Sequence, residues 1–391
     1  MGAGGGARDA GRAAPGGGGD LLTLILLALS ALVVFLLGLQ LAGVGLSLWR
    51  YLVPGRARGL TGRPFITLLR PVCGLDPFDE ETLGSSFTLD YPDYEVIFCA
   101  ARESDPAVAL VRRLTAAHPG VPAQLLIGED LISTNPKLNN LAKGWAVARG
   151  DYIAMTDSNL MLPRDYFQRL LTAWTPGTGL VTSPPAGLRP GNLWGAVECA
   201  FLNSFQARWQ LASDALGNGF AQGKTLFWRR DVLDGAGGLA TLGRNLAEDV
   251  ASTKVVRDQG LQVRLTRTPF AQPIGSRSAR AVWDRQLRWS RVRRDGFPGL
   301  FALEILVGPV VPMLALAVVA PLWLLPALVL WYGAEVILAR VAGWPAGPRD
   351  LLAMVLRDLA LPALWAATWA RRGFEWRGTA MAAEPARPGA K

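Results

Sequence analysis

The feature that most constrains this chain is a run of 29 residues without a charge, from Leu21 to Trp49. A helix needs about 20 mostly apolar residues to cross the hydrocarbon core of a bilayer. A secretory signal peptide is the alternative, but its apolar region has only about 7–15 residues and ends at a cleavage site of small residues. We therefore predict a transmembrane helix over residues 21–49, preceded by a disordered Gly/Ala-rich tract over residues 1–20.

The composition agrees with a membrane protein. Hydrophobic residues make up 50 % of the chain and charged residues only 18 %, whereas soluble domains carry about 25 % charge. The formal net charge of +9 suits anionic partners such as lipid head groups or a pyrophosphate, and we expect membrane lipids rather than nucleic acid. Three cysteines without a CxxC pair, and a single histidine, argue against a disulfide scaffold and a histidine-rich metal centre.

Two further apolar segments lie near the C-terminus. Residues 305–334 carry no charge, and Pro321 and Pro326 interrupt them, which predicts a transmembrane helical hairpin over residues 300–342. Residues 351–370 are also apolar, but Arg357 and Asp358 lie at their centre. A charged pair in mid-bilayer is expensive unless it faces protein, so this segment is either a packed span or an interfacial helix. Residues 371–391 form a tail.

Basic residues flank the first predicted span unequally. The two arginines before it are offset by two aspartates, whereas an arginine-rich segment follows it, with Arg50, Arg56, Arg58 and Arg63. Cytoplasmic flanks carry the excess of basic residues. We therefore expect the central part of the chain to lie in the cytoplasm.

Residues 63–297 alternate short apolar runs with amphipathic stretches, which predicts an α/β domain with a mostly parallel sheet. The expected strands are Phe65–Leu69, Tyr94–Ala100, Ala123–Ile127, Tyr152–Thr156 and Gly179–Thr182. The expected helices are Pro106–Ala117, Pro136–Ala148, Arg164–Ala173, Leu193–Leu211 and Thr241–Gln259. The chain has no GxGxxG and no GxxxxGK[ST] sequence, so neither a dinucleotide-binding fold nor a P-loop NTPase has support.

Two aspartates follow predicted strands. Asp105 comes after the second strand and Asp157 after the fourth, and ligands of open α/β sheets bind outside the carboxyl ends of the strands. A carboxylate in a polar segment such as Asp157–Asn159 offers oxygen ligands to Mg²⁺ or Mn²⁺. We predict that Asp157 binds a divalent cation and that Asp105 contacts a nucleotide. The alternative is that each aspartate only caps the following helix.

Glu248 and Asp249 lie near the start of a predicted helix, and a carboxylate there can exchange a proton with a ligand. The alternative is that Glu248 and Asp249 only favour the positive end of a helix. Farther along, Arg285, Arg288 and Trp289 place two cations and an indole within five residues. They can neutralise a diphosphate and stack on a sugar or base, or they can anchor the chain at the membrane interface.

Lys137 follows a predicted strand and opens a predicted helix in the segment Asn135-Pro-Lys137. Its position near the crevice predicts either a phosphate or structural contact, or a plain solvated lysine. We include Lys137 among the candidates for binding a phosphate-containing ligand.

Taken in order, these motifs resemble those of the ceramide glucosyltransferase family. The resemblance covers residues 65–378. It rests on Asp105, Asp157, Asp249 and the Arg-Gln-Leu-Arg-Trp of residues 285–289, together with the Asn-Pro-Lys segment and the Trp-Arg-Gly of residues 376–378. It implies a GT-A fold and an inverting transfer of a hexose, with glucose favoured, from a UDP-sugar to the primary hydroxyl of ceramide.

The resemblance also implies a β-linked product, a divalent cation, and donor contacts from Asp105, Lys137, Arg285, Arg288 and Trp289. With a ceramide hydroxyl as acceptor, we predict Asp249 as the general base that takes its proton. The sequence departs from the animal relatives in lacking a histidine over residues 203–208 and in having Asn159 where they have glycine. Its abundance of Gly, Ala and Arg indicates a bacterial member, in the inner membrane.

Three other functions are alternatives. The same chemistry on a hopanoid, a diacylglycerol or a polyprenyl phosphate is the first. The second is a processive polysaccharide synthase, which shares the motifs but needs a polymer channel of several transmembrane spans. The third is a membrane scaffold or channel with a degenerate nucleotide-binding domain. Such a protein would lack at least one of the acids Asp105, Asp157 and Asp249, and all three are present.

Overall fold

The computed structural model describes residues 17–54, 59–60, 62–370, 373–376 and 379–381. Most of the predicted disordered tract and most of the tail lie outside the described residues. The first helix, α1 (Gly17–Leu52), is 36 residues long and contains the whole predicted span. It begins before the predicted tract ends, because residues 17–20 are already helical.

The centre of the chain forms a seven-stranded sheet in the order β3-β2-β1-β4-β7-β5-β8. Every neighbouring pair is parallel except the two pairs made by β7, which runs antiparallel to β4 and β5. This confirms the mostly parallel α/β class. The strands are β1 (Ile66–Val72), β2 (Tyr94–Ala100), β3 (Ala123–Ile127), β4 (Tyr152–Thr156), β5 (Thr178–Thr182), β7 (Thr225–Arg229) and β8 (Gln262–Leu265).

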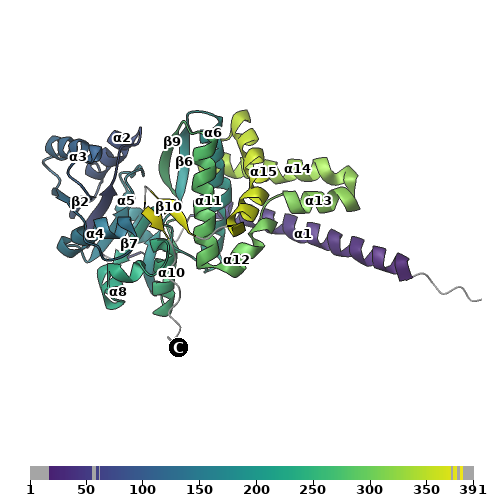
Figure 1. Ribbon diagram of the computed structural model, residues 1–391, viewed down its shortest axis with the longest axis horizontal. Coiled ribbons are helices and arrows are strands. Elements are labelled where there is room, and N and C mark those ends of the chain that lie inside the picture. Colours follow the sequence, from purple (N-terminus) through teal and green to yellow (C-terminus); the bar gives the residue numbers. More distant parts are fainter. Residues whose placement is uncertain (1–16, 55–58, 61, 371–372, 377–378, 382–391) are drawn as a thin grey trace, which may run out of the picture.

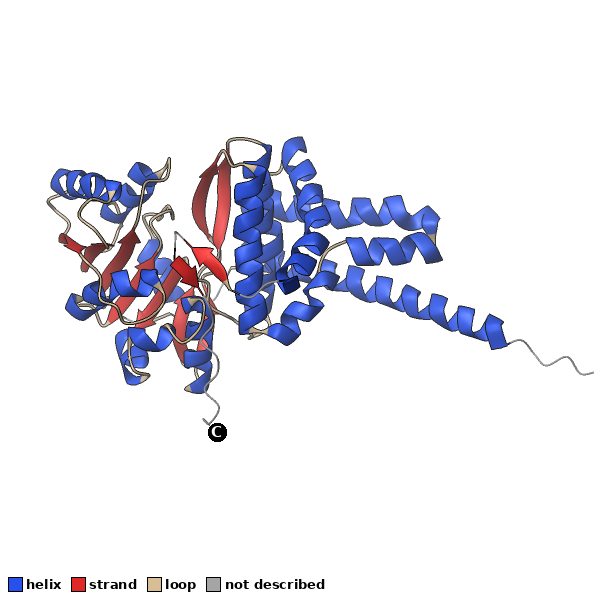
Figure 2. Ribbon diagram, viewed as in Figure 1, coloured by secondary structure: helices blue, strands red, loops and turns tan. Residues whose placement is uncertain are grey.

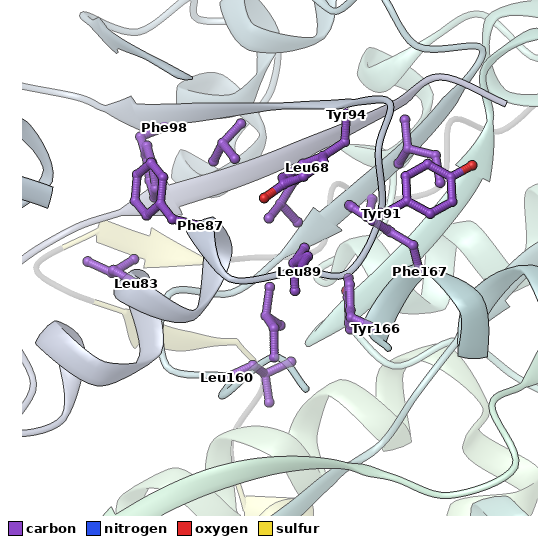
Figure 3. Close-up of a cluster of buried hydrophobic side chains, with 14 of the residues drawn as sticks. Leu68, Leu83, Phe87, Leu89, Tyr91, Tyr94, Phe98, Leu160, Tyr166 and Phe167 are labelled. Carbon is purple, nitrogen blue, oxygen red and sulfur yellow. The ribbon is translucent and has the colours of Figure 1, made fainter. Parts of the chain in front are cut away.

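Helices cover both faces of the sheet, because the strands are apolar on both sides. Leu68 of β1 belongs to the core under one face and its neighbour Leu69 to the core under the other, as the two-residue period of a strand requires. Figure 3 shows the first core, where Phe87, Tyr166 and Phe167 pack around the strands. Its helices are α2 (Asp79–Gly84), η1 (Ser85–Phe87), α3 (Pro106–Ala117) and α5 (Tyr166–Ala173); the other face carries α4 (Pro136–Val147), α8 (Arg230–Gly235), α9 (Leu239–Leu242) and α10 (Glu248–Asp258).

A second layer joins the sheet to the apolar helices (Figure 2). It contains the parallel pair β6 (Pro185–Pro190) and β9 (Phe270–Gly275), helix α6 (Leu193–Ala200), a π-helical segment η2 (Phe201–Ala207), α7 (Arg208–Ala215) and α11 (Ala279–Gly296). The helix predicted over 193–211 is present but contains the π-helical segment. The helix predicted over 241–259 is wrong in its first half, because the chain breaks between α9 and α10.

The C-terminal part is helical up to residue 370. It comprises α12 (Pro298–Leu303), η3 (Glu304–Leu306), α13 (Val310–Val319), η4 (Pro321–Trp323), α14 (Leu324–Ala342) and α15 (Pro348–Ala370), followed by a short hairpin of β10 (Phe374–Trp376) and β11 (Thr379–Met381). Pro321 lies in the turn between α13 and α14, as expected. Pro326 does not interrupt a helix: it lies in the first turn of α14, where its missing N–H leaves no helical bond unmade.

Among the described residues, three helices are long and apolar enough to cross a membrane: Asp20–Leu52, Pro321–Ala342 and Pro348–Ala370. A fourth candidate exists if Pro298–Leu306 and Val310–Val319, which meet at a 44° bend, count as one span. Figure 1 shows α1, α13 and α14 projecting together away from the sheet, while α15 runs across their base beside α11.

The end of α1 is attached to the sheet domain by a buried arginine. Arg50 forms an ion pair with Asp214 of α7 and donates to the carbonyl oxygens of Leu265 and Thr266 at the end of β8. The Asp214 carboxylate also accepts from the Leu265 N–H at 3.2 Å. The first arginine after the predicted span is therefore a structural link between the apolar helix and the α/β domain.

Candidate functional site

The candidate site begins where β4 and β7 pair. Thr156 of β4 lies opposite Thr225 of β7, so the residue after β4 and the residue before β7 are neighbours. The Asp157 N–H donates to the Lys224 carbonyl oxygen at 3.1 Å. Because β7 is antiparallel to β4, it starts at the edge of the sheet where β4 ends, and this brings Lys224 to Asp157.

The Asp157 carboxylate contacts two ammonium groups. Its Oδ1 lies 2.7 Å from Lys137 Nζ, and its Oδ2 lies 2.9 Å from Lys224 Nζ. Burial disfavours its charge, but the two lysines outweigh burial and hold the pKa of Asp157 well below its usual range. Asp157 is therefore a carboxylate at any physiological pH.

Lys137 links the end of β4 to the start of α10. Its Nζ donates to Glu248 Oε1 and to the Gly223 carbonyl oxygen, each at 2.7 Å, besides its ion pair with Asp157. Burial lowers the pKa of a lysine, but two carboxylates outweigh it and raise the pKa of Lys137. For Lys224, which has one carboxylate partner, burial dominates and the pKa is lowered. These contacts exclude the solvated alternative for Lys137, and its contact with a phosphate stays a prediction.

Glu248 was considered only as a helix-terminal charge, yet it is buried in this network. Its second oxygen, Oε2, accepts from Asn135 Nδ2 at 3.1 Å, while Asn135 also caps α4 by accepting from the Lys137 N–H. A side chain at residue 223 would lie 2.8 Å from Glu248 Oε1. A larger residue at position 223 would therefore displace the Glu248 carboxylate from this position.

Asp249 lies beside Glu248 on the first turn of α10. Its Oδ2 accepts from the Gly223 N–H at 3.2 Å, and its Oδ1 accepts from the Val250 N–H at 2.7 Å. Desolvation by the surrounding protein and the adjacent Glu248 charge raise the pKa of Asp249 to about 6. A carboxyl group with a pKa near the working pH is suited to exchange a proton. We call Lys137, Asp157, Lys224, Glu248 and Asp249 the site cluster.

Asp105 makes its contacts outside the site cluster. Its carboxylate accepts from the Ala107 N–H at 2.9 Å and caps α3, as the alternative interpretation predicted. Both of its oxygens also lie 3.0 Å from the Gly74 N–H. Gly74 has a φ of +69°, which favours glycine. Asp105 therefore joins the loops after β1 and β2, and its contact with a nucleotide stays a prediction.

The arginine and tryptophan of α11 are placed by α6 and β9. Arg285 Nη1 donates to the buried Glu198 of α6 at 2.9 Å, and the charge of Arg285 contributes to lowering the pKa of Lys224. Trp289 is partly buried against an apolar group of Cys199, Leu202 and Ile274. Its indole is therefore packed into the second layer, and stacking of Trp289 on a donor, like a donor contact from Arg288, stays a prediction.

The site cluster fits a divalent cation through one carboxylate. Each Asp157 oxygen uses one lone pair on a lysine and has a second one available, and a quarter of the side chain is exposed, at 25 %. Within the described residues there is no group of three His, Cys, Asp or Glu side chains that could hold a metal. Mg²⁺ is commonly bound by one or two carboxylates together with substrate phosphates, so Asp157 is a suitable ligand only when a diphosphate completes the shell.

Sequence reasoning missed Lys224 and the role of Glu248. Lys224 precedes a strand that was not predicted, and an isolated lysine before an apolar run has no distinguishing pattern. Glu248 had a signal, because it directly precedes the chosen base, but the sequence does not show that Lys137 lies against it.

Comparison with known proteins shows the family of the chain. The model of glycosyl transferase family 21 matches residues 23–387. Ceramide glucosyltransferase 1 of Caenorhabditis elegans is 27 % identical over 243 residues, which are 62 % of this chain and 52 % of that protein. Ceramide glucosyltransferase of Komagataella phaffii is 40 % identical over 99 residues, 24 % of this chain and 19 % of that protein.

The matched segments span little more than half of the first of these relatives, at 52 % of its length. Among solved structures, a mannosyltransferase of Pyrobaculum calidifontis in complex with GDP-Man and Mn²⁺ is 20 % identical, with a TM-score of 0.49, over 88 % of this chain and 98 % of that one. The family model covers most of the sequence, from α1 to the tail. The chain belongs to glycosyl transferase family 21.

Proposed function

We propose that this protein transfers a hexose, with glucose favoured, from a UDP-sugar to the primary hydroxyl of ceramide, with inversion at the anomeric carbon. The observation that carries the proposal is the bridge made by Lys137 between Asp157 at the end of β4 and Glu248 at the start of α10. This bridge brings Asp157 and the Glu248-Asp249 pair to one edge of the sheet. Family membership and the names of the relatives support the reaction class.

In this proposal the donor diphosphate binds at the cationic side of the site cluster. Lys137 and Lys224 are held in place by Asp157, and Arg285 is held by Glu198 near Lys224. Cations arranged in advance stabilise the charge that develops on a leaving group. A divalent cation, Mg²⁺ or Mn²⁺, held by Asp157 and the diphosphate would supply further neutralisation of the leaving UDP.

Asp249 acts as the general base in this proposal. The hydroxyl of a lipid alcohol has to lose its proton as its oxygen attacks the anomeric carbon, and Asp249 takes that proton. Its raised pKa of about 6 makes it a better proton acceptor than an ordinary carboxylate while leaving it ionised at neutral pH. Attack from the face opposite the diphosphate converts an α-linked donor into a β-glycoside.

A lipid acceptor agrees with the position of the sheet domain. Arg50 attaches α1 directly to the end of β8, so the site is held close to the apolar helices and to the lipids around them. The excess of arginine after α1 supports a cytoplasmic location for the site, where nucleotide sugars would reach it.

The test is product analysis with defined substrates. The purified protein is reconstituted in vesicles that contain ceramide, a diacylglycerol, a hopanoid or a polyprenyl phosphate, and each is incubated with UDP-glucose, UDP-galactose or UDP-glucuronate in the presence of Mg²⁺ or Mn²⁺. Mass spectrometry identifies the product and NMR its anomeric configuration. We expect β-glucosylceramide carrying a single sugar.

Asp157→Asn serves as the inactive control, and Asp165→Asn, which changes an exposed aspartate on the opposite face of the sheet, is the matched control that retains activity. Transfer to another lipid in preference to ceramide would overturn the acceptor. A polymeric product or an α-linked product would overturn the proposed reaction.

A further inference from the structure

The apolar helices differ in how far they extend from the sheet domain. A cluster of buried polar residues lies where α1, α14 and α15 meet the second layer, and its members are at most 2 % exposed. We call it the boundary cluster; it consists of Gln40, Arg208, Glu335, Arg357 and Asp358. We take the cluster as the level at which hydrocarbon begins, because residues 21–39 of α1 and residues 310–334 of the hairpin, which extend from it away from the sheet domain, carry no charge.

Contacts within the boundary cluster set the register between the helices. Gln40 of α1 donates from Nε2 to Glu335 Oε1 of α14 at 3.0 Å, and its side-chain oxygen accepts from Arg208 of α7. Arg357 of α15 lies 3.0 Å from Glu335 Oε2 and also pairs with Asp358. These residues of four helices, α1, α7, α14 and α15, therefore lie at one level.

From this level α1 is long enough to cross a bilayer. The helix from Gln40 back to Leu21 covers 19 residue steps, which is about 29 Å at about 1.5 Å per residue, against a hydrocarbon core of about 30 Å. Asp20 precedes Leu21 and is the first charge beyond the apolar run. The length of α1 beyond the boundary cluster thus equals one bilayer core.

The hairpin of α13 and α14 reaches only part of that distance. Leu324, the first residue of α14, lies 11 residue steps before Glu335, or about 17 Å at about 1.5 Å per residue. The α1 residues packed against the apolar cluster of the hairpin begin at Leu29. Residues 21–25 of α1 are exposed without interruption, so the helix continues alone past the hairpin, as Figure 1 shows.

The turn of the hairpin is apolar and exposed. Leu322 is 92 % exposed and Trp323 is 66 % exposed, and residues 305–334 contain no charge. The backbone of the turn leaves few donors without partners, as hydrocarbon requires. Pro321 has no N–H, and the N–H groups of Trp323 and Leu324 donate to the carbonyl oxygens of Ala320 and Pro321.

Helix α15 stays at the level of the boundary cluster. Arg357 and Asp358 at its centre belong to that cluster, and further along Trp365 Nε1 donates to the Phe301 carbonyl oxygen of α12 at 3.1 Å. Arg294 of α11 donates to the Thr368 carbonyl oxygen near its end. Figure 1 accordingly shows α15 lying across the base of the projecting helices.

We infer that α1 is the one described helix that crosses the membrane, and that the α13–α14 hairpin is re-entrant, with its turn in the hydrocarbon, while α15 lies at the interface. The hairpin surface is covered by lipid acyl chains, and its turn lies just beyond the middle of the hydrocarbon core. This proposal differs from the expectation of a hairpin that spans the bilayer, and of the two interpretations left open for residues 351–370 it adopts the interfacial helix.

Cysteine labelling in sealed vesicles of both orientations tests this topology. In a Cys73→Ser background, single cysteines replace Asp20, Leu322, Met381 and, as the marker of the sheet domain, the exposed Arg113, and the reagent is a membrane-impermeant maleimide. We expect Asp20→Cys to react from the face opposite Arg113→Cys, and Met381→Cys from the same face. Leu322→Cys should react from neither face and become reactive in detergent.

A depth measurement keeps the test independent of labelling efficiency. Nitroxide spin labels are attached at Leu322→Cys, Ala28→Cys and Leu21→Cys, and the ratio of their accessibility to oxygen and to a water-soluble nickel complex reports the depth. The ratio should be equal at Leu322→Cys and Ala28→Cys. It should be lower at Leu21→Cys. Reaction of Leu322→Cys from either face of sealed vesicles, or a depth equal to that at Leu21→Cys, would overturn the re-entrant hairpin. Reaction of Met381→Cys from the face of Asp20→Cys would overturn the interfacial position of α15.

Discussion

The site cluster and the boundary cluster are both buried groups of charged side chains, yet they are built differently. In the site cluster three carboxylates face two ammonium groups, and Asp157 keeps 25 % of its side chain exposed. In the boundary cluster two guanidinium groups face two carboxylates, and each of the four is at most 2 % exposed. The first is unbalanced and partly open, whereas the second is balanced and closed.

This difference indicates what each cluster can do. A closed, neutral cluster has its partners within the protein, so its loss affects folding. An open cluster with an excess of carboxylate keeps lone pairs and a raised pKa, that of Asp249, for partners from outside. Charge balance and exposure therefore separate a structural network from a candidate active site even though the residue types are the same.

The largest expected effect is the loss of turnover when the site cluster loses Asp249. Asp249→Asn should lower kcat by about 10²–10⁴-fold, the range for loss of a general base, with little change in UDP binding measured by calorimetry. Asp258→Asn, at the exposed far end of α10, is the matched control with unchanged kcat. Near-wild-type turnover of Asp249→Asn would exclude it as the base and leave only a contribution to the helix terminus.

The next largest effect is a loss of stability when the boundary cluster loses a carboxylate. Glu335→Gln removes the carboxylate shared by Arg357, Gln40 and Arg208 and should lower the free energy of unfolding by about 3–5 kcal/mol, as expected when one partner of a buried ion pair is lost. Thermal or denaturant unfolding in detergent measures it.

The control for this change is Glu81→Gln, which breaks the exposed pair with Arg189 and should cost less than about 1 kcal/mol. The two clusters would not differ as described if Glu335→Gln lowered kcat of the folded protein as strongly as Asp249→Asn does.

The pH dependence of the open cluster gives a smaller effect. Because the pKa of Asp249 is raised to about 6, its base form is lost as the pH falls through that value, and kcat/KM should drop about tenfold per pH unit below it. The same shift means that the free energy of unfolding decreases as the pH rises from the ordinary carboxyl pKa towards 6. A rate profile that is flat down to pH 5, or a break retained in Asp249→Asn, would contradict this assignment.

The smallest effect concerns Asp105, outside both clusters. Asp105→Ala should lower the free energy of unfolding by about 0.5–2 kcal/mol through the loss of the α3 cap, and Asp105→Asn, which retains an acceptor oxygen, should lower it less. Calorimetry with UDP then isolates the proposed nucleotide contact. Unchanged UDP affinity in Asp105→Asn would leave this residue as a link between two loops.

The local elements were largely predictable because they depend on short-range patterns. Strands β2, β3 and β4 and helix α3 have the bounds that alternation, apolar runs and the Asp105-Pro106 cap predict. The helix predicted over residues 241–259 begins seven residues before α10. The apolar residues of α9 have the helical spacing of those in α10, so the sequence does not show the break between the two helices. Strand β7 was not predicted, because alternation of strands and helices indicates parallel strands and gives no sign of an antiparallel one. Lys224, which directly precedes β7, was missed for the same reason.

By itself the sequence determined that an apolar helix precedes an α/β domain, and that Asp105 and Asp157 follow parallel strands, because helix length and strand periodicity are properties of consecutive residues. Only the tertiary structure decided which charges meet. Lys137, Asp157 and Glu248 are far apart in the chain, and their contact depends on how β7 and α10 pack on the sheet. The level of α14 relative to α1 was likewise set by the contact between Gln40 and Glu335, since composition measures how apolar a segment is and not where it lies beside another helix.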